Sequence, residues 1–113
     1  MKIINQSRGT VLAERAEEAA TIIRRMKGLL GRKTFSPQEA LLIKPCNSVH
    51  TFFMRFAIDV LFLDRNNRVI MAIPALQPFR ITAVYFKARS AVELPAGTIH
   101  SSKTSPGDII LLG

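Results

Sequence analysis

Short apolar runs separated by turn-forming residues predict that most of this chain folds into β-strands. The runs are rich in β-branched and aromatic side chains, and Gly, Pro, Asn or Asp stands between most of them. Residues 64–68 predict a hairpin turn, because asparagine tolerates the left-handed backbone conformation. We expect strands over residues 2–5, 10–12, 40–44, 48–56, 58–63, 69–73, 80–86, 90–94 and 109–112.

One segment near the start has the period of a helix instead. Apolar side chains between residues 14 and 27 fall on one arc of a helical wheel, at Ala16, Ala19, Ile22, Ile23 and Met26. Acidic residues stand in the first turns and basic residues in the last, which complements the helix dipole. We therefore expect an amphipathic helix over 14–27, ended by Gly28 or Gly31.

These elements together predict one small, mostly β domain over residues 1–113, a β-sandwich or barrel with the helix packed at an end or over an opening. The length of 113 residues and the 48% of hydrophobic residues suit a single core. No apolar run reaches the roughly 18 residues that cross a bilayer, and residues 1–9 lack the apolar stretch of a signal peptide. We expect a cytoplasmic protein without a transmembrane segment.

Cysteine and histidine are too scarce for a disulfide or a zinc-held fold. The single cysteine is Cys46, and the two histidines are His50 and His100. His100 stands in the polar stretch 100–105, which we interpret as a solvated loop. We expect no metal, no cofactor and a monomer. A thiolate nucleophile at Cys46 is disfavoured, because four-residue spacing brings it to His50 only on a helix, which Pro45 opposes.

The net charge of +8 and the sequence pI near 10.6 favour an anionic partner. A run of five cations without an acid is the candidate anion-binding patch, formed by Arg24, Arg25, Lys27, Arg32 and Lys33. It could meet the phosphates of nucleic acid or of an anionic surface. A solvated helix face with favourable dipole placement explains the same residues without a ligand.

Four motifs, in order along the chain, resemble those of the DUF192 family, also called UPF0127. They are the central stretch 48–64 (SVHTFFMRFAIDVLFLD), KGLLGR at 27–32, ELPAG at 93–97 and the Gly-Asp pair at 107–108. Ala57 and Asn67 depart from the proline and glycine that the family commonly has. The resemblance implies a mostly β, jelly-roll-like fold, and it implies no established biochemical function.

Polar residues inside the central stretch are the candidate site. Our hypothesis is a pocket or groove with Met54, Phe53 and Phe56 as its apolar wall. The alternative is a structural network in which Arg55 pairs with Asp59 or Glu93. The candidate ligand-binding residues are His50, Thr51, Met54, Arg55 and Asp59.

These observations favour a small non-enzymatic binding or accessory domain for an unidentified small-molecule or protein ligand. One alternative is a hydrolase or transferase-like enzyme for a small anionic or sugar-like substrate, in which Arg55 holds the anion and His50 or Asp59 moves a proton. Another is a non-specific binder of nucleic acid or an anionic surface through the run of cations between Arg24 and Lys33.

Overall fold

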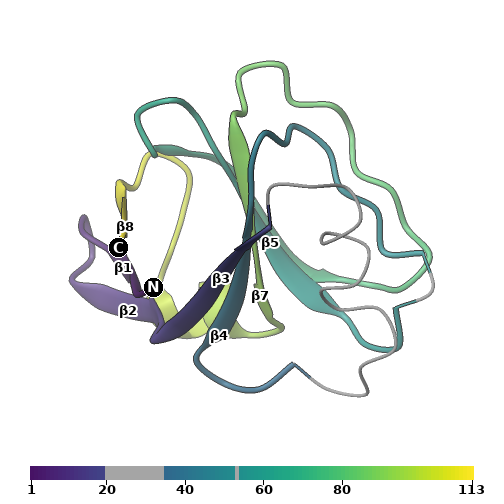
Figure 1. The fold of residues 1–113 in the computed structure, drawn as a ribbon, viewed down its shortest axis with the longest axis horizontal. Helices are drawn as coiled ribbons and strands as arrows, with labels where there is room; N and C mark the ends of the chain where they lie inside the picture. Colours follow the sequence, from purple (N-terminus) through teal and green to yellow (C-terminus); the bar gives the residue numbers. More distant parts are fainter. Residues whose placement is uncertain (20–34, 53) are drawn as a thin grey trace.

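The computed structural model describes residues 1–19, 35–52 and 54–113, and its strands form two sheets (Figure 1). The larger sheet has the strand order β3-β4-β7-β5-β6. Its members are β3 (Arg15–Ala19), β4 (Glu39–Ile43), β5 (Ile58–Leu63), β6 (Val69–Leu76) and β7 (Ser90–Pro95). The smaller sheet has the order β2-β1-β8, built from β1 (Ile3–Asn5), β2 (Thr10–Ala13) and β8 (Ile110–Leu112). A short helix, α2 (Thr98–Ser102), follows β7.

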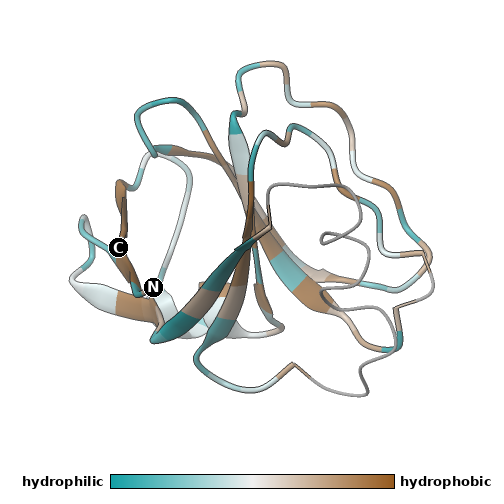
Figure 2. Cartoon of the chain, in the orientation of Figure 1, coloured by the Kyte–Doolittle hydropathy of each residue, from teal (hydrophilic) through white to brown (hydrophobic). Residues whose placement is uncertain are grey.

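Strand β5 lies between β6 and β7 and is buried along its whole length. Successive side chains point to opposite faces of a sheet, so β5 serves two core clusters. Leu61 and Leu63 join a cluster with residues of the smaller sheet, whereas Val60 and Phe62 join one with Cys46 and other residues beyond β4. Figure 2 shows the hydrophobic colour gathered on the central strands, while β3 is hydrophilic over much of its length.

Among the described residues, connections and not strands cover the second face of the larger sheet. Two segments, 44–57 and 77–89, run side by side there (Figure 1) and are joined by backbone hydrogen bonds from Cys46 to Arg89 and from Tyr85 to Asn47. We call these two segments the loop layer. Its buried side chains complete the cluster around Phe62, so the loop layer is part of the core as well as of the surface.

Several predicted strands are confirmed. The predicted hairpin is formed by β5 and β6, which pair antiparallel on either side of the turn at 64–68. Asn67 has φ of 61° in this turn, the left-handed conformation that asparagine tolerates. The two strands predicted at 2–5 and 10–12 also form a hairpin, as β1 and β2.

The predicted helix is wrong where the structure describes it. Residues 15–19 form β3, which pairs in parallel with β4 over its whole length, and residues 20–27 lie outside the described part of the chain. Ala16 and Ala19 are small apolar residues that serve either period, and the ladder to β4 decides between them. The helix of the described residues is α2, in a stretch that we had expected to be partly a solvated loop.

The strands predicted over 48–56 and 80–86 are also wrong. A single β-bridge between His50 and Ile81 joins the two segments, because side-chain hydroxyls accept some of the backbone N–H hydrogen bonds that a strand ladder would need. The backbone N–H of Val49 donates to the hydroxyl of Thr82, and that of Arg80 donates to the hydroxyl of Thr51.

The described strands form two sheets and do not close into a barrel, so the barrel alternative is wrong for this part of the chain. The parallel pairing of β3 with β4 departs from the purely antiparallel sheets of a jelly roll. Within the described ranges, no helix is long and apolar enough to cross a bilayer.

Candidate binding surface

Thr51 fastens the two segments of the loop layer to each other. It is fully buried, and its hydroxyl donates to the carbonyl of Gln77 at 2.6 Å and accepts from the N–H of Arg80 at 2.9 Å. Its backbone N–H donates to the Arg80 carbonyl, and its carbonyl accepts from the N–H of Phe79. These partners inside the protein give Thr51 a structural role, which is to hold the shape of the layer.

Asp59 is likewise buried and occupied by backbone groups. One carboxylate oxygen accepts from the N–H of Ala75 at 2.8 Å, and the other from Gly97 at 3.1 Å and Ile99 at 2.8 Å. Hydrogen bonds of this kind compensate the loss of water around a buried charge. Arg55 is exposed, and the structure records no ion pair between it and Asp59, both of which are described. The predicted pairing of Arg55 with Asp59 is therefore not formed.

The remaining candidate residues are either buried in the core or exposed at the surface. Met54 is 5% exposed and belongs to the core cluster around Phe62. His50 is exposed, and its ring stacks on that of Phe52 with centroids 5.2 Å apart. The structure therefore turns Thr51, Met54 and Asp59 inward and leaves His50 and Arg55 outward. The predicted patch between Arg24 and Lys33 lies outside the described residues.

The loop layer carries a feature that the sequence analysis missed. Among the described residues, eight large hydrophobic side chains are exposed, and five of them belong to this layer. The highest exposed fractions are 89% at Phe86 and 69% at Ile81; the others are 56% at Phe79, 49% at Val84 and 39% at Phe52. The sequence pattern predicted a strand over 80–86 and gave no indication of these exposed side chains.

The same layer is cationic throughout. It contains Lys44, Arg55, Arg80, Lys87 and Arg89, and the sequence has no Asp or Glu within 44–57 or 77–89. The side chain of Lys44 pairs with Glu18 at 3.8 Å. For the other four cations, no ion pair is recorded with any described residue. The absence of acids from these two stretches was the sequence signal that could have singled out the layer.

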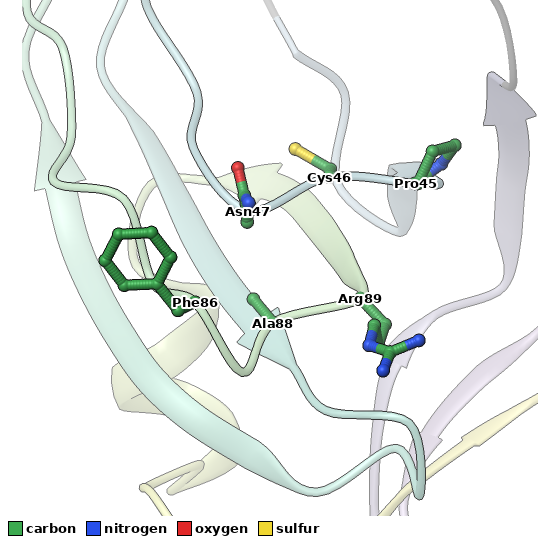
Figure 3. Close-up of a pocket in the computed structure, with 6 residues that line it drawn as sticks. All are labelled: Pro45, Cys46, Asn47, Phe86, Ala88 and Arg89. Carbon is green, nitrogen blue, oxygen red and sulfur yellow. The ribbon is translucent and has the colours of Figure 1, made fainter.

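A hollow of about 400 Å³ opens at one end of the loop layer (Figure 3). In this view, the backbone of 45–47 faces that of 86–89, and the hydrogen bonds between Cys46 and Arg89 and between Tyr85 and Asn47 fix this spacing. The thiol of Cys46 is buried and contacts the Ser48 carbonyl at 3.1 Å. The lining residues are Pro45, Cys46, Asn47, Phe86, Ala88 and Arg89.

A second hollow, of about 290 Å³, lies between the layer and the β5–β6 turn. Phe86 and Arg89 line both hollows. The lining residues are Asp64, Arg65, Asn66, Phe86, Lys87 and Arg89. Three of these six are cations, and the acid, Asp64, already accepts backbone hydrogen bonds from Asn66 and Arg68.

Comparison with known proteins places almost the whole chain in one set of relatives. The model of the family DUF192, described as "Uncharacterized ACR", matches residues 3–112. The UPF0127 protein PH1112 of Pyrococcus horikoshii is 37% identical over 114 residues, covering 96% of each chain. The UPF0127 protein PF1050 of Pyrococcus furiosus is 33% identical over 112 residues, covering 94% of this chain and 93% of its own.

Two crystal structures share the fold. A protein of unknown function from Novosphingobium aromaticivorans superposes with a TM-score of 0.83 at 18% identity, over 98% of this chain and 82% of its own. A putative transcription regulator from Sinorhizobium meliloti superposes with a TM-score of 0.81 at 22% identity, over 97% and 89%. At these identities the likeness establishes the fold alone.

Proposed function

This chain belongs to the DUF192 family of uncharacterised proteins, and from its own surface we propose that it is a non-enzymatic binding module for an anionic partner. The contact surface is the outward side of the loop layer, including His50 and Arg55 from the predicted groove. One observation carries the proposal: five cations and no acid share this layer with five exposed large hydrophobic side chains.

Each half of that observation points to a partner. Exposed apolar side chains concentrated on one part of a surface are typical of interaction sites, because contact removes them from water at roughly 25 cal/mol per Å². Four of the five cations have no ion pair recorded with a described residue, and such cations raise the local positive potential, which steers an anionic partner and strengthens its contact. A layer with both properties suits a partner that offers negative charge beside apolar or aromatic groups.

The structure of the layer supports a preformed surface. The hydrogen bonds of Thr51 and Thr82 hold the two segments together before any partner arrives. A preformed surface loses less conformational entropy on binding than a loop that must be ordered.

The enzyme alternative has less support. It assigned proton transfer to His50 or Asp59, and the carboxylate of Asp59 is buried beneath three backbone donors where a substrate has no access. A general base must come within hydrogen-bond reach of the proton that it takes.

The test compares two variants with the same change in net charge. Arg80→Gln with Lys87→Gln removes two charges from the loop layer, and Lys2→Gln with Lys103→Gln removes two from elsewhere. On a column of immobilised heparin, a sulfated polyanion, we expect the first variant to elute at clearly lower salt than the second. Equal shifts of both variants would show that net charge alone governs retention, which contradicts the proposal.

A further inference from the structure

We propose that Phe86 and the two hollows beside it form a binding site for single-stranded nucleic acid. An unpaired base would stack on the Phe86 ring, and Arg65, Lys87 and Arg89 would contact the phosphates. This inference rests on the proposed function, because it names the partner at one end of the loop layer.

The exposure of Phe86 is the first support. Its side chain is 89% exposed, the highest value among the exposed large hydrophobics of the described residues. The neighbouring Tyr85 instead packs on Phe62 with centroids 4.8 Å apart, and its backbone N–H is bonded to Asn47. The chain thus buries one aromatic ring and presents the next, and a presented ring is a platform on which a base of any sequence can stack.

The charges around Phe86 are the second support. Arg65, Lys87 and Arg89 all line hollows that Phe86 also lines, and no ion pair to a described residue is recorded for any of them. They come from two separate parts of the chain, the β5–β6 turn and the end of the loop layer. Cations that share a hollow with an exposed aromatic ring suit a ligand that joins phosphates to a planar base.

Polar groups of the hollows are the third support. Asn47 lines the first hollow and Asn66 the second, and both residues are exposed. A side-chain amide offers a donor and an acceptor, which match the hydrogen-bonding edges of bases. The first volume, about 400 Å³, lies within the roughly 300–1,000 Å³ of ligand sites, and the second, about 290 Å³, lies just below that range.

Single strands fit this arrangement better than duplexes or membranes. In a duplex the faces of the bases are covered by their neighbours, so a protein ring reaches only unpaired bases. An anionic membrane would accept the cations and the apolar side chains, but it makes no use of an exposed ring that lines two hollows. Binding to vesicles is therefore an outcome that the experiment must separate.

The experiment measures fluorescence anisotropy of a labelled oligothymidylate of about 12 nucleotides, within the span of single-strand sites. We expect binding at low salt that is at least about fivefold tighter than to a duplex of equal length. Phe86→Ala should weaken it by about tenfold, and Phe86→Leu, which keeps apolar bulk without a π-face, should weaken it to a similar degree. Leu111→Ala, an exposed apolar change on β8, should alter it less than about twofold.

Three results would overturn the inference. They are equal affinity for single strand and duplex, unchanged affinity of Phe86→Ala, and sedimentation with phosphatidylserine vesicles without oligothymidylate binding. Any of these leaves the proposed function standing if the heparin comparison still separates the two charge variants. If that comparison fails, the proposed function itself is wrong.

Discussion

The carboxylate of Asp59 on β5 accepts a hydrogen bond of 2.8 Å from the backbone N–H of Ile99 in α2, forty positions along the chain. The same oxygen accepts from Gly97, whose φ of 98° suits a glycine, and the other oxygen accepts from Ala75 on β6. One side chain thereby joins the central motif at 48–64 to the motif at 93–97. Asp59 is a structural anchor beneath α2.

Removing this anchor should strongly destabilise the domain. Asp59→Ala leaves three backbone donors without their acceptor, and we expect a loss on the order of 3 kcal/mol or more in the free energy of unfolding. Urea denaturation followed by circular dichroism measures it. As a control, Asp64→Ala changes a carboxylate in the more exposed β5–β6 turn and should lose about 1 kcal/mol. Similar losses for both variants would contradict the assignment of Asp59 as an anchor.

Thr51→Val should loosen the loop layer without creating a cavity. Valine has nearly the shape of threonine, but it leaves the Arg80 N–H and the Gln77 carbonyl without the hydroxyl partner. We expect a loss of about 1–2 kcal/mol and faster hydrogen exchange of the Arg80 amide. Ser101→Ala, on the exposed side of α2, is the control and should change stability by less than about 0.5 kcal/mol. Unchanged exchange at Arg80 would contradict this role of Thr51.

The ionisation of Asp108 should make the stability of the fold depend on pH. Burial by itself raises the pKa of Asp108, but hydrogen bonds from Asn5 and Ser105 and the nearby Arg8 guanidinium together hold it below its ordinary value of 3.8. A lowered pKa in the folded state means that the ionised form favours folding. This contribution is complete above the unfolded pKa near 3.8 and is lost as the pH falls through the folded value.

Thermal unfolding between neutral pH and about pH 2 tests the Asp108 effect, since this range spans the titration of a carboxyl group. The melting temperature of the wild type should decrease as the pH drops below about 4. Asp108→Asn cannot titrate at this position, so its melting temperature should decrease less over the same range. Parallel curves for the two proteins would show that Asp108 does not contribute to the acid sensitivity.

Asn67 should tolerate glycine and reject a branched side chain. Its φ of 61° is left-handed, and its carbonyl accepts from the N–H of Ile110, which ties the turn to β8. We expect Asn67→Gly to change stability by less than about 1 kcal/mol and Asn67→Val to lose about 1–2 kcal/mol, measured by urea denaturation. Equal stability of the two variants would show that this backbone conformation does not constrain the residue.

Local patterns predicted those parts of the fold whose partners are close in sequence. The β5–β6 hairpin follows from two apolar runs around an asparagine turn, and β1–β2 follows from the same logic. The pattern failed at β3, because Arg15–Ala19 pairs in parallel with β4, more than twenty positions away, and that ladder overrides the helical preference of alanine and glutamate.

The sequence named residues 50–59 as a candidate site, but it could not indicate which of their side chains are buried. The burial of Thr51 and Asp59 depends on Arg80, Gln77, Gly97 and other groups that are distant in sequence. Phe86 was placed in a strand, and its exposure depends on Tyr85 having turned toward Phe62.

The sequence by itself determined a mostly β chain, its strong positive charge and its membership of the DUF192 family, because composition, short-range period and motif order are local properties. Only the tertiary structure decided which polar residues became anchors and which faced water. That choice depends on where distant backbone donors come to lie, since a buried carboxylate such as Asp59 is stable only where such donors converge. The acid-free loop layer, in which the exposed Phe86 lines two hollows, is the surface that we propose for a partner.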